Sequence, residues 1–250
     1  MTAAYFAYLA GMAVTRRSWR PAVLSLAALV MLFTAGMASA MPLVYLLAGY
    51  WLPAMLVREP NVQLERRLLD VDRTLFGAHG LDRFATGAPR VLIEYLELAY
   101  LLCYAVVPAG FAFLLLAGYD GHTLDTFWSV VLLAAFVCYG LLPWLPTRAP
   151  RAIEPPLRAQ RSSIRSVNLS VLNRASVQWN TFPSGHTAAS LATALAVGIH
   201  VPLAGVVLGV VALSIAAGSV AGRYHYAADA IIGAAVAVLA FVMVTAAHGL

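Results

Sequence analysis

Apolar stretches long enough to cross a membrane alternate with polar segments along this 250-residue chain. Five of these stretches follow residue 90, at 91–118, 126–144, 183–200, 201–221 and 227–247. A helix needs about 20 residues to span the apolar core of a bilayer, so each stretch predicts one crossing. The last three are joined by very short connections, and we expect their helices to be antiparallel neighbours.

The first long apolar stretch, residues 21–57, exceeds the length of one untilted helix. Pro42 disfavours helix just before it, so the stretch is either two crossings broken near Met41 or one crossing followed by a helix in the interface. We predict one crossing, with residues 43–57 partly in the interface, which gives six crossings in all; two crossings would give seven. The arginines before this stretch and Ala38-Ser39-Ala40 also resemble a signal peptide, but we expect residues 1–40 to be retained as a membrane anchor.

Two polar segments interrupt the apolar pattern. Residues 58–90 carry nearly balanced charges, and their apolar residues recur with the spacing of an amphipathic helix on the membrane surface, which indicates a linker or a lid. Residues 145–182 carry six arginines against a single acid, Glu154. We therefore distinguish an amino-terminal anchor and linker, 1–90, from a helix bundle, 91–250, within one structural domain.

Composition supports the membrane interpretation. Hydrophobic residues make up 62% of the chain, charged residues only 11%, and the mean hydropathy is +0.81, whereas a soluble globular domain has about a quarter of its residues charged. We predict an all-α, polytopic membrane helix bundle. The net charge of +5 comes from arginine alone, because the chain has no lysine. These arginines lie between apolar stretches, which suits lipid phosphates and argues against nucleic acid as a partner.

Several residues are interpreted as structural. Cys103 and Cys138 lie inside apolar stretches without metal-ligand spacing. Glu94 and Glu97 stand near the start of a predicted helix, where we favour an interaction with its dipole over headgroup recognition. Two glycine pairs have the GxxxG spacing of close helix contacts, Gly205/Gly209 and Gly218/Gly222.

Three polar clusters fall at one face of the predicted membrane region. They are residues 148–151, 183–186 and 223–229, and a loop or an even number of crossings separates them. In the last cluster His225 and Asp229 are four residues apart at a helix start, so the carboxylate can orient one imidazole nitrogen and leave the other free to attack. This pair alone is equally compatible with a structural pairing.

The middle cluster adds a candidate anion site. Pro183, Ser184 and Gly185 open a helix whose free N–H groups and dipole favour a phosphate. His186 would stand beside that phosphate as a general acid. Three arginines have the charge and geometry to bind the phosphate oxygens, Arg148, Arg151 and Arg223. Together the clusters indicate phosphoryl-transfer chemistry rather than a structural arrangement.

The sequence Pro183-Ser184-Gly185-His186, followed by His225-Tyr226-x-x-Asp229, resembles the type 2 phosphatidic acid phosphatase superfamily. The second motif and the segment from Pro146 to Arg151 are most similar to its branch of inositol phosphorylceramide synthase-like and sphingomyelin synthase-like proteins. The resemblance covers about the carboxy-terminal two-thirds, so residues 91–250 are expected to be the catalytic bundle.

This resemblance implies a role for each matching residue. His225 would be the nucleophile that forms a phosphohistidine, Asp229 its orienting partner and His186 the general acid. Ser184 and Gly185 would donate to the phosphate. The chemistry it implies needs no metal and no cofactor, and the substrate would be a phospholipid or lipid phosphate.

The chain also departs from the superfamily pattern. The usual first motif begins with a lysine and ends in Arg-Pro, and here Arg148 and Arg151 can replace it only by position and charge. The phosphatase branch has an arginine six residues before the nucleophile, where this chain has Ser219 and carries Arg223 instead. These differences favour transfer to a lipid or polyol hydroxyl over simple hydrolysis by water, although the same intermediate serves both.

The class and the location of the protein have alternatives. A non-enzymatic transporter or scaffold could use the same polar residues for an ion path, but the internal symmetry typical of transporters is absent from the sequence. The arginines of residues 145–182 place the site in the cytoplasm by the positive-inside rule, whereas the resemblance implies the periplasmic or exoplasmic face of a bacterial-type inner or plasma membrane. With Arg16, Arg17 and Arg20 inside and six crossings, we predict the exoplasmic face.

Overall fold

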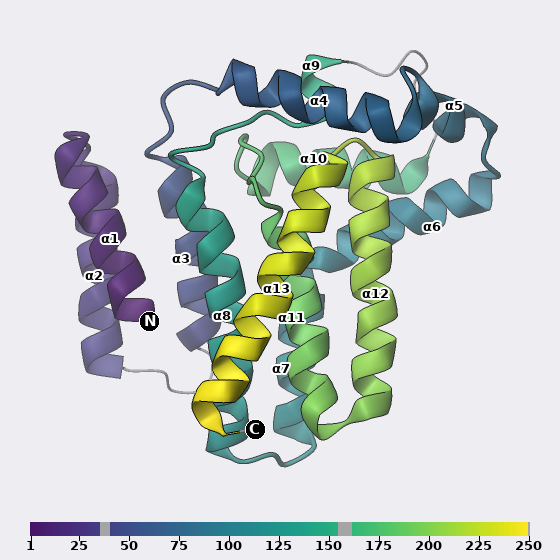
Figure 1. The fold of residues 1–250 in the computed structure, drawn as a ribbon. Helices are drawn as coiled ribbons and strands as arrows, with labels where there is room; N and C mark the ends of the chain where they lie inside the picture. Colours follow the sequence, from purple (N-terminus) through teal and green to yellow (C-terminus); the bar gives the residue numbers. More distant parts are fainter. Residues whose placement is uncertain (36–40, 155–161, 250) are drawn as a thin grey trace.

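The computed structural model describes residues 1–35, 41–154 and 162–249. Within these ranges the chain forms helices and no strand, which confirms the all-α class predicted from the sequence. Apolar helices run side by side along the molecule (Figure 1). In chain order they are α1 (Thr2–Thr15), α2 (Trp19–Ala35), α3 (Met41–Ala54), α7 (Val106–Leu116), α8 (Gly121–Leu141), α11 (Gly185–His200), α12 (Pro202–Ala221) and α13 (Ala227–His248).

Several of these helices have the length and composition of membrane spans. Among the described residues α8, α12 and α13 qualify on their own. A fourth candidate combines α6 (Arg90–Leu101), η1 (Leu102–Tyr104) and α7. The chain bends by 61° between the segment Arg90–Tyr104 and α7. The helices α1, α2 and α3 are shorter but apolar. This is the architecture of a polytopic membrane helix bundle.

Helix α11 lies at the centre of the bundle, packed against α7, α8, α12 and α13. Its buried faces carry small side chains, including Ala188, Ala192 and Ala196. Small residues let neighbouring helices approach closely, which favours van der Waals packing inside a membrane. This packing fixes the amino end of α11, where His186 lies.

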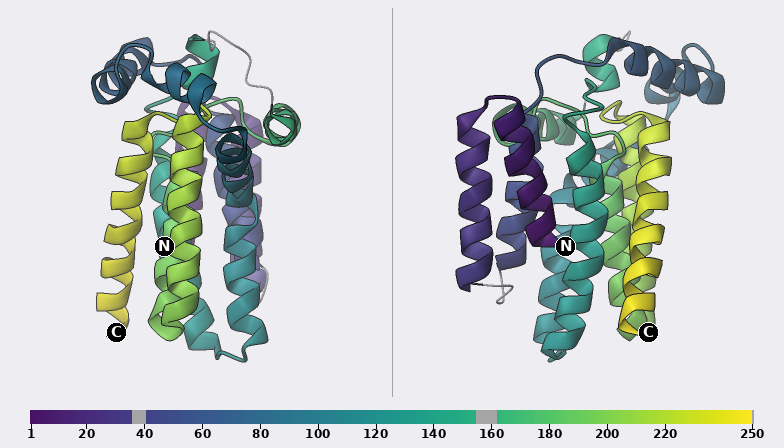
Figure 2. Two further views of the ribbon diagram at one scale, coloured as in Figure 1. Left: turned by 90° about the vertical axis from the view of Figure 1, so that its right-hand side faces the viewer. Right: turned by 60° about the vertical axis from the view of Figure 1, so that its left-hand side comes forward.

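Four further helices lie across one end of the bundle, which we call the site end (Figures 1 and 2). They are α4 (Val62–Phe76), α5 (Gly80–Gly87), α9 (Pro150–Ile153) and α10 (Ser163–Ala175). Helix α4 begins at Asn61, whose side chain accepts a hydrogen bond from the N–H of Leu64 at 3.0 Å. It is amphipathic, as the sequence predicts: Leu68 and Leu69 are buried against Tyr226 while the opposite face is exposed.

The amino-terminal part differs from the predicted arrangement. We predicted that residues 43–57 lie in the membrane interface after a single crossing. Instead, α3 packs in the bundle and runs back along α8 towards the site end (Figure 1). Pro42 stands at the start of α3, where a missing N–H costs nothing. The hydroxyl of Tyr5 donates to the carbonyl of Gly49 at 2.8 Å, which holds α3 in the bundle. Residues 21–57 thus contribute two apolar helices to the bundle, α2 and α3, both shorter than the candidate spans.

This arrangement also relocates the first arginines. The guanidinium of Arg16 donates to the carbonyls of Leu56 at 2.5 Å and Pro143 at 3.1 Å. The turn between α1 and α2 therefore lies at the same end of the bundle as the three polar clusters, and not at the opposite end.

The glycines of α12 differ in what surrounds them. A Cβ at Gly218 would collide with the carbonyl oxygen of Leu96 on α6, and a Cβ at Gly205 would collide with the backbone of Gly198 on α11. Gly222 lies against the ring of Tyr224. Gly209 has open space around it. Three of the four predicted packing glycines thus make close contacts, and Gly209 makes none.

The first prediction follows from this contrast. Gly218→Ala should lower the thermal stability of the detergent-solubilised protein, because overpacking against backbone costs about 1–3 kcal/mol. Gly209→Ala, on the same helix, should be neutral or stabilising by up to about 1 kcal/mol, since alanine favours helix. Equal midpoints for the two variants in a tryptophan-fluorescence melt would contradict the close α6–α12 contact.

Candidate active site

Two histidines from different parts of the chain meet at the site end. His186 is in the first turn of α11, and His225 precedes α13; their ring centroids are 5.7 Å apart and the planes are nearly perpendicular. Both line a small cavity of about 40 Å³, together with Arg151, Asn180 and Tyr224 among others. The close packing of α11 between α12 and α13 brings these distant positions together.

Asp229 holds His225 in place. Its Oδ2 lies 3.3 Å from Nδ1 of His225 and accepts hydrogen bonds from the Nδ2 of Asn180 at 2.5 Å and the backbone N–H of Tyr226 at 3.2 Å. A neutral imidazole that donates from Nδ1 keeps the lone pair of Nε2 free to attack. This is the geometry that the four-residue spacing predicts.

Asn180 is a site residue that the sequence motifs did not reveal. Its backbone N–H donates to the carbonyl of Thr147 at 2.7 Å, which fixes the loop before α11 against the segment after α8. Its side chain then reaches Asp229, 49 positions away. Only its nearness to Pro183 could have drawn attention to it, and that is a weak signal.

His225 is 4% exposed. Burial lowers the pKa of His225 to about 3, and the positive charge of Arg151 acts in the same direction. The imidazole is therefore neutral near physiological pH. A neutral ring is the form in which a histidine can act as a nucleophile.

The backbone N–H groups at the start of α11 have hydrogen-bond acceptors within the protein. The side chain of Ser184 accepts from the N–H of Thr187 at 3.3 Å, and that of Thr181 accepts from the N–H of Gly185 at 3.1 Å. The N–H of Ser184 donates to the carbonyl of Asp229 at 3.0 Å. Ser184 and Gly185 are buried and do not line the histidine cavity in this structure. They connect α11 to α13, while the predicted contact with phosphate remains a prediction.

The three candidate arginines lie in three different surroundings. Arg151 lines the histidine cavity, with its guanidinium 4.9 Å from the ring centroid of Tyr224. Among the described residues no carboxylate is paired with it. Arg148 instead binds both carboxylate oxygens of Glu65 on α4, at 3.0 and 2.7 Å. Arg151 is thus the one of the three candidate arginines that lies beside the histidines.

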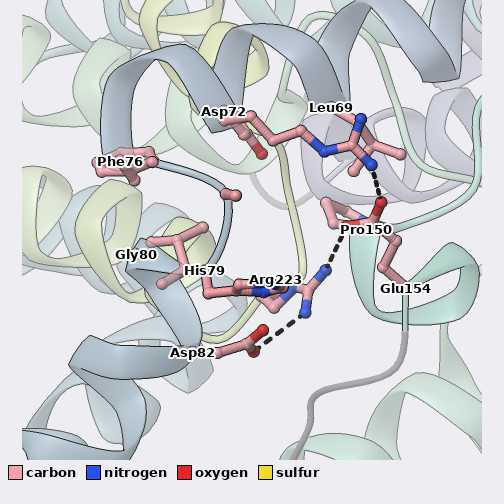
Figure 3. Close-up of a pocket in the computed structure, with 13 residues that line it drawn as sticks. Leu69, Asp72, Phe76, His79, Gly80, Asp82, Pro150, Glu154 and Arg223 are labelled. Carbon is pink, nitrogen blue, oxygen red and sulfur yellow. Dashed lines mark hydrogen bonds and ion pairs between the residues drawn. The ribbon is translucent and has the colours of Figure 1, made fainter.

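Arg223 faces a second pocket, of about 400 Å³, between α4, α5 and α9 (Figure 3). Its guanidinium lies between Asp82, at 3.2 Å, and Glu154, at 3.4 Å. Its φ of 58° is in the left-handed region, which is costly for a residue other than glycine. The carbonyl of Arg223 accepts from the N–H of Arg151 at 3.2 Å, so this turn positions Arg151 through the backbone.

Three tyrosine rings surround His186, from α3, α6 and η1. The ring centroids of Tyr50, Tyr100 and Tyr104 lie 6.1, 6.0 and 5.5 Å from that of the imidazole. Tyr100 also stacks on Tyr224, with 4.1 Å between the centroids. The sequence did not single out these tyrosines, because aromatic residues in apolar helices are most often core residues.

The two acids of α6 lie beyond the first turn of the helix and bind groups of other elements. Glu97 is buried and accepts hydrogen bonds from the hydroxyl of Tyr224 at 2.6 Å and the guanidinium of Arg165 at 2.7 Å. Glu94 accepts from the hydroxyl of Ser162 at 2.7 Å, at the start of α10. The dipole interpretation favoured from the sequence is therefore wrong for both.

Across the described ranges no group of three or more His, Cys, Asp or Glu side chains has an arrangement that could hold a metal ion. Independence from metal stays a prediction from the resemblance.

A comparison with protein families identifies one match. A family model described as the PAP2 superfamily matches residues 66–243. The match begins within the predicted linker, at α4, and extends to the last turns of α13. No curated protein and no solved structure matches the chain.

The second prediction concerns Asp72 on α4, which accepts a hydrogen bond from the N–H of Ala227 at 2.9 Å. Burial raises the pKa of Asp72 from 3.8 to about 6. The ionised form is thus disfavoured in the folded protein, and this cost is absent below about pH 4 and complete above about pH 6. Asp72→Asn keeps an acceptor oxygen without the charge, so its melting temperature should exceed that of the unchanged protein at about pH 8 but not at about pH 4.

The matched control is Asp70→Asn, because Asp70 lies on the same helix with an exposed carboxylate. It should show no such pH-dependent gain. A loss of stability in Asp72→Asn that is the same at both pH values would contradict the burial argument.

Proposed function

The chain belongs to the PAP2 superfamily, and from this premise we propose that it transfers a phosphoryl or phospho-headgroup from a lipid through a covalent intermediate on His225. Membership of the superfamily, together with the apolar helices, supports an integral membrane enzyme of lipid phosphatase or phosphotransferase type. The identity of the nucleophile and the nature of the acceptor are the proposal. The observation that carries it is the neutral His225, oriented by Asp229 and facing His186 across the cavity.

The first step joins His225 to phosphorus. The lone pair of Nε2 forms the N–P bond while the ester P–O bond breaks, and His186, which is protonated in the substrate complex because it lies beside the negative phosphate group, gives its proton to the departing oxygen. Asp229 stabilises the positive imidazole that results. In the second step a hydroxyl compound attacks phosphorus, His186 takes its proton, and the N–P bond returns its electron pair to His225.

Arg151 supports this proposal by its charge. The phosphorus group carries negative charge throughout, and a guanidinium in a buried cavity stabilises that charge more strongly than one in water. Arg151 lines the cavity without a carboxylate partner among the described residues, so its donors are available. The ring of Tyr224 and the carbonyl of Arg223 hold it in position.

An apolar cavity of about 520 Å³ supports a lipid substrate. It lies between α3, η1, α7, α8 and α11, and its lining includes Leu46, Leu47 and Val107. Tyr50 and His186 line both this apolar cavity and the histidine cavity. A lipid could therefore present its phosphate to His225 while its chain stays in apolar surroundings, which favours lipids over soluble phosphate esters.

We propose a lipid or polyol hydroxyl as the acceptor, with water as the alternative. The arginine of the phosphatase branch is replaced by Ser219, whose carbonyl accepts from the N–H groups of Tyr224 and His225. This position supports the turn that carries His225 and offers no charge to the phosphate. The absence of that charge favours the transferase branch.

The third prediction separates the two histidines. His225→Ala should lower turnover of every substrate by about 10³-fold or more, because the nucleophile is lost. His186→Ala should lower turnover of alkyl esters by about 10²- to 10⁴-fold, but affect an activated aryl ester much less, because a good leaving group needs no proton. Initial rates in mixed micelles with both ester types provide the measurement.

The control is His200→Ala, at the other end of α11 from His186. It should retain full activity. Equal losses with alkyl and aryl esters in His186→Ala would rule out the acid role, and substrate binding without turnover by the unchanged protein would favour a transporter.

The fourth prediction tests the apolar cavity. Leu47→Trp should place a larger side chain at its edge and raise the KM for a long-chain lipid phosphate roughly tenfold, the effect of losing about 1.4 kcal/mol of apolar contact. Turnover of a short-chain soluble analogue should not change. Val44→Trp, exposed on the same helix but outside the cavity lining, is the control and should leave both substrates unaffected. If Leu47→Trp affects both substrates alike, the chain does not occupy this cavity.

A further inference from the structure

The arginines are distributed very unevenly between the two ends of the bundle. All 16 basic residues of the chain are arginines, and in the sequence they fall in four segments, 16–20, 58–90, 148–174 and 223. Each of these segments has described residues at the site end. Two of the arginines, Arg158 and Arg161, lie outside the described residues.

Hydrogen bonds tie these segments to one another. Besides the contacts of Arg16 with residues 56 and 143, the N–H of Asn61 donates to the carbonyl of Pro146 at 2.7 Å. An ion pair between Glu65 and Arg148 connects α4 to the segment after α8. A second ion pair, between Asp82 and Arg223, connects α5 to the turn between α12 and α13. The guanidinium of Arg165 donates to the carbonyl of Gly222 at 3.3 Å. The segments therefore lie on one face of the membrane.

The opposite end has the reverse charge. Its described part comprises the loop before α8, the turn between α11 and α12, and the end of α13. It carries Asp120 and Asp125 and no arginine. The sequence between α2 and α3, residues 36–40, contains no charged residue either.

We infer that the catalytic cavity opens to the cytoplasm. Arginine and lysine in short loops are retained on the cytoplasmic side during insertion, and acids have little influence on this choice. The expected exoplasmic site depended on a single crossing between residues 21 and 57, which would have put Arg16, Arg17 and Arg20 opposite the site. Because α3 returns to the site end, these arginines and the site share one face.

Substrate binding does not account for this distribution. Of the described arginines, only Arg151 lines the histidine cavity. Arg73 and Arg148 pair with acids of α4, Asp70 and Glu65. Arg16 donates to the backbone carbonyls of residues 56 and 143, also at the site end. The asymmetry therefore reflects orientation in the membrane.

The orientation determines which molecules can reach the site. The identity of these molecules, unlike the orientation itself, rests on the proposed function. The lipid donor comes from the cytoplasmic leaflet, so a reaction that forms a lipid phosphate ester on the cytoplasmic side supplies it without transbilayer movement. The hydroxyl acceptor, or water, comes from the cytoplasm or from the same leaflet.

Single cysteines at the two ends test the orientation. In a background with Cys103→Ala and Cys138→Ala, Thr74→Cys lies on the exposed face of α4 at the site end, and Gly121→Cys lies at the opposite end with open space around its Cβ. A membrane-impermeant maleimide on intact cells should label Gly121→Cys, and should label Thr74→Cys only after lysis. The background without cysteine should stay unlabelled.

The reverse pattern, or labelling of both cysteines in intact cells, would overturn the inference. Labelling in denatured lysate shows that each thiol is reactive and each protein is present. Activity is measured separately, with a long-chain lipid phosphate in mixed micelles, where the detergent-solubilised protein is accessible from both ends. Correct labelling with no turnover in the micelles would refute the proposed function and leave the orientation intact.

Discussion

The arrangement of the two histidines depends on the buried carboxylate of Asp229. One oxygen accepts from Asn180 in the loop before α11, from the backbone of Tyr226 at the start of α13, and lies against His225 in the turn after α12. Two chain segments far apart in sequence, the loop that carries Asn180 and residues 225–229, are thereby joined at a single buried atom. Since an unpaired buried charge is very costly, displacing any of these partners would disturb His225 and the start of α13 together.

Helix α4, which lies across the site end, adds further hydrogen bonds around the turn that carries His225. Asp72 on α4 accepts from the first N–H of α13, and the hydroxyl of Tyr226 donates to the carbonyl of Arg148, which is itself bound to Glu65. The amphipathic helix α4 thus covers the turn that carries His225 by both polar and apolar contacts. Most of α4 also lies within the matched family region, which begins at residue 66.

Local patterns in the sequence predicted what depends on local geometry. The four-residue spacing of His225 and Asp229 led to their contact, and the apolar stretches led to the helical class. Partners across the bundle were not predictable, because a charge in a sequence does not reveal its counter-ion: Arg148 and Arg223 bind acids of α4, α5 and α9. The return of α3 escaped prediction for a similar reason, since its place depends on Tyr5 and Phe136 packing against Gly49.

The central claim is that phosphorus becomes bonded to His225, and trapping that bond tests it most directly. The protein is mixed with a lipid whose phosphate is labelled, quenched in alkali within one turnover, digested, and mapped by mass spectrometry. The account predicts an acid-labile, alkali-stable phosphoryl group on the peptide that contains His225. Complete turnover with the label recovered on another residue, or on no residue at any quench time, would contradict it.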